Sequence, residues 1–562
     1  MRWRHLDKSL FVWVLLIGVL LVLVVNPLAR LLWASFEHGA TGAFTLDNYA
    51  AAYGRWRYLE ALWNSLVLGL AVAVLGTVFG VPMAWAVSRT DMPAKGLVWA
   101  AILGTFIVPS YLGAVAWILL AGPNAGWLNR LYVWLTGAAS GPLNIYSMAG
   151  LVLVIACYSF PYAFVFTRSA LDLISSEMEE AASTLGAGTL RTMLRVTLPL
   201  TLPAILGAFI VEFLEAIALF GAPALIALPA RFQVMTTMLW QFFEFPPKVQ
   251  VAAAYSMPLL AITVFLFWLQ RRIIARKGYV ALTGKGGERR LIRLGGWRWV
   301  MLGYCLFVTS LSFFLPMLVV LQAAFAKAWG RGFGLDNITL ENLRFVLIDQ
   351  PITRAATLHT FVYGGTAAAI ALGLGLSIAY IVHRRLVPLG GALAYIAMAP
   401  FVIPGIVLAI GFYAAYTTPP LVLYGGAWIL ILAFTTRFLP IAYANSDAAI
   451  RSLNPELEDA VRILGGGRLL AMRRVVGPLL KRGLAGAFIL VFIPATRELS
   501  SAIFLYTTGT QVLSVLLFDK SDEGNFEILS SIGLILVVIT VALVLAGFRL
   551  AGRDFMLKRT AS

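Results

Sequence analysis

Two polar segments, EEAASTLGAGTLRTMLRVTLPL (Glu179–Leu200) and EDAVRILGGGRLLAMRRVVGPLL (Glu458–Leu480), interrupt a chain that is otherwise mostly apolar. Of its 562 residues, 60% are hydrophobic and only 12% are charged. A water-soluble globule cannot hide that much apolar surface, so the composition predicts a chain whose main solvent is lipid. The two segments share their order of residue types, which predicts a tandem repeat.

Long apolar stretches predict the fold class. A helix of about twenty residues crosses a bilayer core of about 30 Å and satisfies its own backbone hydrogen bonds there. We recognise about 12 such stretches, which predict an all-α polytopic membrane protein with about 12 transmembrane helices. Two of them, residues 97–121 and 391–413, contain the related sequences FIVPSYLGAV and FVIPGIVLAI.

The repeat divides the chain into two halves of six predicted helices each, residues 1–270 and 299–562, joined by a basic linker over residues 271–298. If the N-terminus is cytoplasmic, most of the 43 lysines and arginines fall on the cytoplasmic side, as the positive-inside rule requires. We therefore expect both termini and the linker in the cytoplasm. Topology and contact with membrane lipid then explain the net charge of +17, and no nucleic-acid partner is needed.

The two polar segments, taken as residues 172–200 and 452–480 and called the paired segments below, fall between the fourth and fifth predicted helix of each half. Each is expected to form a helix, a turn and a second short helix on the cytoplasmic side of the membrane. Gly186 and Gly465 supply the permissive backbone that ends the first helix. The small side chains of Ala181, Ala182 and Ala460 leave room for a close contact.

The first paired segment resembles the signature of ABC importer permeases, which reads E-A-A, three residues, G, nine residues, an apolar residue, one residue and L-P. The second departs from it at Asp459, Val461 and Gly477. In that family the element is a coupling helix that sits in a cleft of a cytoplasmic ATPase, so two copies imply two tandem type I permease domains. The residues that the resemblance implies in ATPase coupling are Glu179, Glu180, Ala181, Ala182, Gly186, Glu458, Asp459, Ala460 and Gly465.

The resemblance also implies partners and a location. Two copies of a cytoplasmic ABC ATPase would use ATP and Mg, and this chain would bind no cofactor and catalyse no reaction. A periplasmic or extracellular substrate-binding protein would deliver the substrate to a multi-pass permease in the bacterial inner membrane. The alternative class is a secondary transporter or channel, which has no need of docking elements for an external motor.

Further runs, RELSSAIFLYTTGTQVLSVLLF from Arg497 and PARFQVMTT from Pro229, resemble the ferric-iron type of fused permease. This resemblance favours ferric iron as the substrate, with a polyamine, thiamine or an organophosphate as alternatives. The 4 histidines form no ligand cluster with Cys, Asp or Glu at a recognisable spacing, so no metal site is predicted.

Charged residues inside the predicted spans mark a candidate translocation pathway, because a charge in the bilayer is costly. They are Glu212, Glu215, Arg437, Arg497 and Glu498. An acidic lining formed by Glu212 and Glu215 suits a cation, whereas the arginines suit an anion. The alternative is that these charges form structural ion pairs between helices, and the sequence leaves both interpretations open.

Overall fold

The computed structural model describes residues 8–39, 41–174, 176–244, 246–276, 291–332, 334–387 and 390–551. Within these ranges the chain is helical, and its β-structure is limited to isolated bridges that join Glu37 to Phe44, Thr90 to Ile292 and Ala326 to Ile338. Residues 277–290, half of the linker that the sequence predicts over residues 271–298, lie outside the described residues.

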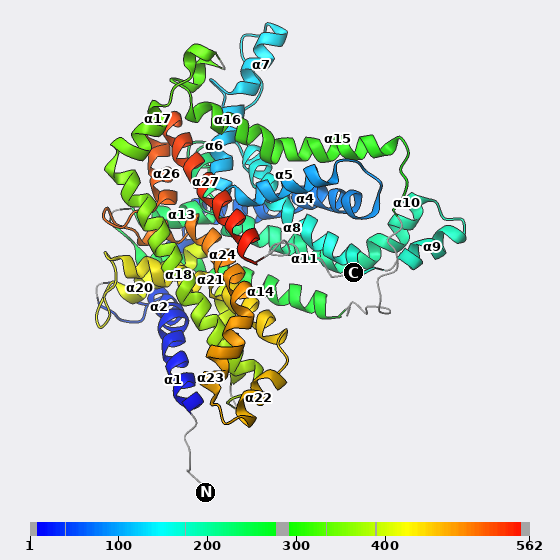
Figure 1. The fold of residues 1–562 in the computed structure, drawn as a ribbon. Coiled ribbons are helices and arrows are strands. Elements are labelled where there is room, and N and C mark those ends of the chain that lie inside the picture. The colour runs from blue at the N-terminus through cyan, green and yellow to red at the C-terminus, as the bar shows by residue number, and fades with distance from the viewer. Residues whose placement is uncertain are drawn as a thin grey trace.

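The helices of the two halves follow one another in the same order (Figure 1). The first half contains α1 (Lys8–Leu20), η1 (Leu21–Val25), α2 (Asn26–Ser35), α3 (Asp47–Tyr53), α4 (Trp56–Arg89), α5 (Lys95–Ile107), α6 (Ser110–Ala121), α7 (Trp127–Thr136), α8 (Met148–Leu173), α9 (Ser176–Thr184), α10 (Thr189–Thr192), η2 (Met193–Thr197), α11 (Leu198–Ala218), α12 (Gly221–Ile226), α13 (Met235–Gln241) and α14 (Val249–Arg276). The second contains α15 (Trp297–Thr309), η3 (Ser310–Phe314), α16 (Leu315–Ala324), η4 (Trp329–Arg331), η5 (Leu335–Asn337), α17 (Glu341–Arg344), η6 (Phe345–Asp349), α18 (Pro351–His383), α19 (Gly390–Met398), η7 (Ala399–Phe401), α20 (Gly405–Tyr416), α21 (Ala427–Arg451), α22 (Glu456–Ile463), α23 (Arg468–Ala471), η8 (Met472–Val476), α24 (Gly477–Thr496), α25 (Ala502–Leu505), α26 (Leu513–Asp522) and α27 (Phe526–Ala551). The predicted all-α tandem architecture is confirmed.

Ten helices of the described chain are long and apolar enough to cross a membrane, and the total rises to 12 if two bent helix pairs each count as one span. These pairs are α5 with α6, bent by 104°, and α19–η7 with α20, bent by 111°. The sequence predicts an uninterrupted apolar span at each place. Pro109 and Pro404 explain the bends, because proline donates no backbone hydrogen bond and forces the preceding residue out of the helical conformation.

The first span of each half packs against the other half. In one direction, the Thr436 hydroxyl of α21 donates a hydrogen bond to the Leu23 carbonyl of η1 at 3.1 Å. In the other, the Tyr304 hydroxyl of α15 donates to the Val78 carbonyl of α4 at 2.6 Å. The two halves are therefore intertwined, and neither buries its helices alone.

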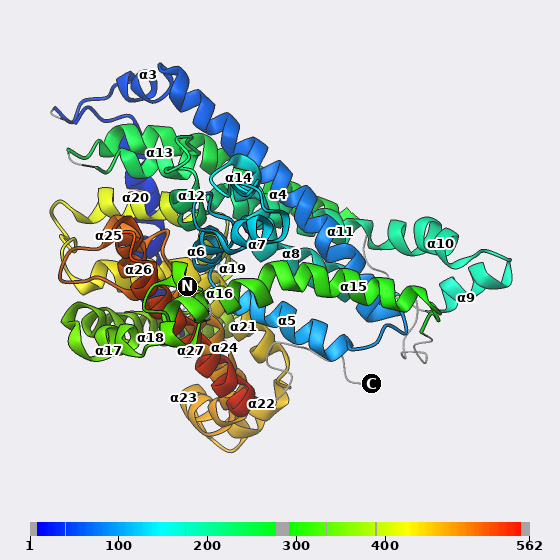
Figure 2. The ribbon, with the colours of Figure 1, turned by 90° about the horizontal axis from the view of Figure 1, so that it is seen from above.

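The two halves meet through an aromatic cluster at the end away from the paired segments. The ring of Phe220, just before α12, lies 5.5 Å from the ring of Phe518 in α26 and 6.1 Å from that of Phe504 in α25. Phe243 is 4.9 Å from the same Phe504 ring. From this end the helices of the two halves diverge, so that α9 and α10 lie at one extremity of the molecule and α22 and α23 at another (Figures 1 and 2).

Candidate functional site

Each paired segment consists of a short helix, a glycine turn and a second short helix, as the sequence predicts. Gly186, between α9 and α10, has φ +81°, and Gly465, between α22 and α23, has φ +82°. Residues other than glycine rarely adopt this left-handed backbone conformation. A Cβ atom at either position would meet no heavy atom within 4 Å, so backbone conformation and not crowding requires glycine there.

An apolar side chain projects into solvent directly before each of these glycines. Leu185 is 88% exposed and Leu464 is 87% exposed, and Ile463 beside it is 85% exposed. Ala181 and Ala460 on the preceding helices are exposed as well. Exposed apolar side chains thus recur at equivalent positions of the two halves.

The acidic residue near the start of the first paired segment points back into the chain. Glu179 is 9% exposed, and its carboxylate lies 3.7 Å from the Arg89 guanidinium at the end of α4. The Thr197 hydroxyl donates a hydrogen bond to the same carboxylate at 2.8 Å. Glu179 is thus held by its own half, whereas the sequence grouped it with the residues that face an ATPase. The side chain of its neighbour Glu180 lies outside the described part of the structure.

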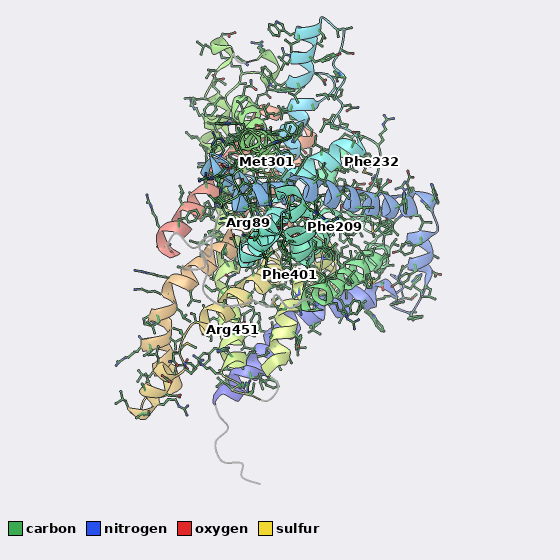
Figure 3. All side chains as sticks on the ribbon, turned by 90° about the vertical axis from the view of Figure 1, so that its right-hand side faces the viewer. Arg89, Phe209, Phe232, Met301, Phe401 and Arg451 are labelled. Atoms are coloured by element: carbon green, nitrogen blue, oxygen red, sulfur yellow. The ribbon has the colours of Figure 1, made fainter. Side chains whose placement is uncertain are left out.

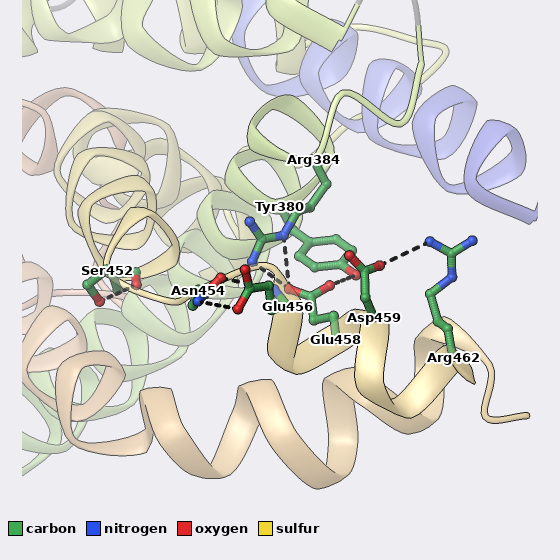
Figure 4. Close-up of polar contacts among 9 residues, drawn as sticks. Tyr380, Arg384, Ser452, Asn454, Glu456, Glu458, Asp459 and Arg462 are labelled. Atoms are coloured by element: carbon green, nitrogen blue, oxygen red, sulfur yellow. Dashed lines mark hydrogen bonds and ion pairs between the residues drawn. The ribbon is translucent and has the colours of Figure 1, made fainter. Parts of the chain in front are cut away.

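The second paired segment repeats this arrangement (Figure 4). Glu458 is 8% exposed and accepts hydrogen bonds from the Tyr380 hydroxyl at 2.8 Å and from Arg384 at 2.9 and 2.6 Å. Asp459 is exposed and lies 3.4 Å from Arg462 on the same helix. The two adjacent acids therefore differ, since Glu458 points inward and Asp459 remains on the surface.

Arg497 joins the second half to the bend in the first. Its guanidinium donates hydrogen bonds to the carbonyl oxygens of Phe106 at 2.6 Å and Ile107 at 3.1 Å. These carbonyls lie at the C-terminal end of α5, where the helix ends before Pro109 and leaves acceptors without intrahelical donors. A cation at that end also opposes the helix dipole favourably.

Arg437 makes the corresponding contact at the second bend, where it donates to the Ile403 carbonyl at 2.5 Å. Close by, Glu498 accepts hydrogen bonds from the backbone N–H and the hydroxyl of Ser501 at 2.9 and 3.1 Å. Glu215 comes from the first half, and its side chain is exposed even though charged residues of the second half surround it.

The structure brings four of the five predicted pathway residues together across the two halves. Glu215 lies within electrostatic range of Arg437, Arg497 and Glu498, and Tyr162 of α8 lies in range of Glu215 and both arginines. These five residues are called the central cluster below. Nothing in the sequence around Tyr162 marked it, because an uncharged residue in an apolar span looks like ordinary core.

Glu212 lies within electrostatic range of one member of the central cluster, Tyr162. It is fully buried inside the first half, against Gly76 of α4. Its carboxylate lies 3.4 Å from the Thr77 hydroxyl and 3.3 Å from the Ala163 backbone N–H, both of which donate to it. Glu212 is therefore buried within the first half, whereas Glu215, one helical turn further along α11, is exposed.

No group of three or more His, Cys, Asp and Glu side chains in the described ranges is placed to hold a metal ion. The central cluster has two carboxylates, but two guanidinium groups lie among them.

Comparison with known proteins places these features in a family. The family described as "Binding-protein-dependent transport system inner membrane component" matches residues 76–279 and 371–553, and each match includes one paired segment. Ferric transport system permease protein FbpB of Actinobacillus pleuropneumoniae is 25% identical over 93% of this chain and 75% of its own length. Putative ferric transport system permease protein FbpB 1 of Haemophilus influenzae is 26% identical over 81% of this chain and 72% of its own. Putative 2-aminoethylphosphonate transport system permease protein PhnV of Salmonella paratyphi A is 26% identical over 43% of this chain and 90% of its own.

Proposed function

Because the chain belongs to the family of binding-protein-dependent transport system inner membrane components, and is thus a permease of an ABC importer, we propose that it carries ferric iron and is driven by ATPase subunits that dock on its paired segments. The observation that supports docking most strongly is the matched pair of exposed leucines, Leu185 and Leu464, each directly before a left-handed glycine. We call each of these turns, Leu185–Gly186 and Leu464–Gly465, a tip. One tip in each half supports two copies of the ATPase. ATP and Mg belong to those subunits, and this chain supplies the path.

The proposal includes an orientation in the bacterial inner membrane. The paired segments and both termini face the cytoplasm, where the positive-inside rule places most of the 43 lysines and arginines. A periplasmic or extracellular substrate-binding protein then delivers the substrate to the opposite face, where the aromatic cluster around Phe220 and Phe504 joins the halves. The domain division at residues 270 and 299 belongs to the same proposal.

The central cluster supports a cation as cargo. Arg437 and Arg497 both donate to backbone carbonyls at the helix bends, which occupies part of their hydrogen-bonding capacity. Glu215 is an exposed carboxylate of the first half that lies among charged residues of the second half. A passing cation can therefore meet Glu215 while the arginines keep the bends in place.

Two relatives named for ferric transport support iron, whereas the relative named for 2-aminoethylphosphonate supports an anionic organophosphonate as the second candidate. For that cargo the guanidinium groups of the central cluster would be the attractive groups. Polyamines and thiamine remain alternatives within the cation class.

Uptake by the reconstituted importer tests the substrate. We expect uptake of radiolabelled Fe(III) from its binding protein, and we expect Glu215→Gln to lower it by about tenfold, the factor that corresponds to ~1.4 kcal/mol of lost attraction. Glu212→Gln on the same helix is the comparison, and we expect it to lower uptake less, because this carboxylate is fully buried and already accepts hydrogen bonds from Thr77 and Ala163. Uptake of 2-aminoethylphosphonate in place of iron, with loss on neutralising Arg437, would overturn the assignment.

A further inference from the structure

We propose that Glu179 and Glu458 are internal anchors, each of which makes a paired segment move together with the second long helix of its own half. The inference rests on the proposed function, because it concerns how a conformational change of a docked ATPase is transmitted to the membrane-spanning helices. It assigns these two acids a positioning role, and leaves contact with the ATPase to the exposed residues Leu185 and Leu464.

The first anchor fixes the hinge at which the first paired segment begins. Arg89, at the C-terminal end of α4, is 5% exposed and donates hydrogen bonds to the carbonyls of Leu171 at 2.7 Å and Ile174 at 2.8 Å, where α8 ends. The same guanidinium lies 3.7 Å from Glu179 in α9. One side chain therefore holds α4, the end of α8 and the start of the paired segment in a fixed relation.

The second anchor has a glutamate–arginine pair at the equivalent place. Arg384 follows the last residue of α18, and its side chain and that of Glu458 are each 11% exposed. Tyr380, one turn earlier on α18, binds the other carboxylate oxygen at 2.8 Å. Two halves that differ in most of their residues thus share an inward-facing glutamate paired with an arginine at the end of the second long helix.

Burial is what makes these pairs suitable as mechanical links. Removing one partner of a buried ion pair leaves an uncompensated charge, so such a pair resists separation far more than a surface pair does. A displacement of α9 or α22 is then passed on to α4 or α18 as a rigid movement. The side chains of the pair Asp459–Arg462 are 60% and 58% exposed, so this pair separates at a much lower cost in free energy.

The first anchor extends further than the second. The Ile292 N–H donates to the Arg89 carbonyl at 2.8 Å, and the Asp91 N–H donates to the Ile292 carbonyl at 3.0 Å. The Asp91 carboxylate also accepts from the Leu294 N–H at 2.9 Å. Residues 291–294 lead into α15, the second-half helix that packs on α4, so the first anchor reaches both halves. In the described residues no backbone bridge of this kind follows Arg384.

Hydrogen exchange on the full chain in lipid nanodiscs tests the anchors without any partner. For Glu179→Gln we expect exchange at residues 176–192 to rise about tenfold while residues 456–471 stay unchanged, because local opening depends on the local contacts. For Glu458→Gln the pattern reverses. The double variant Arg384→Glu with Glu458→Arg restores the opposite charges of the second anchor and brings exchange at residues 456–471 back toward the wild-type rate. Unchanged exchange in both single variants would overturn the proposal.

The assembled importer supplies the second readout, the number of ATP molecules hydrolysed per Fe(III) ion taken up. Glu179→Gln should leave the ATPase bound and raise this ratio about tenfold. Hydrolysis continues in this variant, but the movement of the ATPase is no longer transmitted to the membrane helices. Arg451→Ala is the matched control, because Arg451 pairs with Asp447 at 2.9 Å within α21 and links no segments. Loss of the ATPase in Glu179→Gln would show a contact role and overturn the anchor. Absence of an ATPase from the wild-type chain would instead overturn the proposed function.

The extension through the linker has its own pair of variants. Asp91→Ala removes the acceptor of the Leu294 N–H, whereas Asp91→Asn keeps a side-chain oxygen at that place. We expect Asp91→Ala to raise hydrogen exchange at residues 291–294 and to increase the number of ATP molecules hydrolysed per Fe(III) ion taken up. For Asp91→Asn we expect both quantities to stay close to those of the wild type. Equal behaviour of the two variants would contradict a link between the first anchor and α15.

Discussion

Gly186 and Gly465 determine the shape of the two tips that carry the exposed leucines. Both adopt the left-handed conformation, at φ +81° and +82°. The left-handed conformation costs a residue with a Cβ atom roughly 1–2 kcal/mol, and it costs a β-branched residue more. Because open space surrounds both positions, a substitution there changes the turn without disturbing any packing.

The double variant Gly186→Val with Gly465→Val should therefore insert into the membrane normally and lose most ATP-driven uptake. The turns would shift the neighbouring leucines out of the positions that a partner cleft requires. Gly188→Val is the matched control, since Gly188 also lies in open space but has no left-handed backbone. Undiminished uptake in the double variant, measured at equal expression, would count against docking at these tips.

Sequence alone could locate the tips but could not sort their acids. The glycines and the acidic helix starts are visible as a polar interruption between apolar runs, and the fold confirms the helix, turn and helix at both places. Glu179 and Glu180 look alike in sequence. Arg89, which is distant along the chain and near in space, determines that Glu179 is buried. Local residue patterns do not reveal a partner of that kind.

At the scale of elements, proline shapes the helices in two ways. It breaks α5–α6 and α19–α20 at Pro109 and Pro404. In addition, each of the five described π-helical turns ends two residues before a proline, namely Pro27, Pro199, Pro316, Pro351 and Pro478. A wider turn relieves the clash between the proline ring and the preceding carbonyls. The bends leave carbonyl groups free, and the arginines of the central cluster bind them.

Replacing Arg497 tests how much its cap contributes to the first bend. Arg497→Ala leaves the carbonyls of Phe106 and Ile107 without their charged donor, which should destabilise the chain by about 2 kcal/mol and lower its thermal unfolding temperature. Arg344→Ala removes a guanidinium that is 73% exposed and pairs with Asp349, so it should change stability by less than about 1 kcal/mol. Equal unfolding temperatures for the two variants would show that Arg497 does not hold the bend.

Hydropathy could not predict the bends, and the reason is physical. A bilayer-length apolar run reads as one span whether or not it is straight, and both bent pairs satisfy that criterion when joined. The repeated proline in FIVPSYLGAV and FVIPGIVLAI was the available signal, but a proline inside a helix can also be tolerated, as Pro82 is within α4. Only the neighbours that receive the freed backbone groups distinguish the two outcomes.

At the scale of the whole molecule, the two halves form one intertwined unit with separate ends. Each half lends its first span to the other, and the central cluster and the aromatic cluster both draw residues from both halves. Arg89, at the end of α4, and Arg451, at the end of α21, lie in different parts of the molecule (Figure 3). The repeat predicted two similar halves, but the exchange of first spans depends on contacts between distant segments that an internal repeat does not encode.

The central claim is that the two paired segments each receive an ATPase subunit. We expect the chain purified from its native membranes to carry two ATPase copies, counted by native mass spectrometry, and to hydrolyse ATP. Leu185→Asp with Leu464→Asp should abolish both properties. Leu335→Asp, at a leucine that is also 87% exposed but lies outside the paired segments, should retain them. Transport that proceeds without any bound ATPase, and that the double variant leaves unchanged, would contradict the account and indicate a self-sufficient transporter.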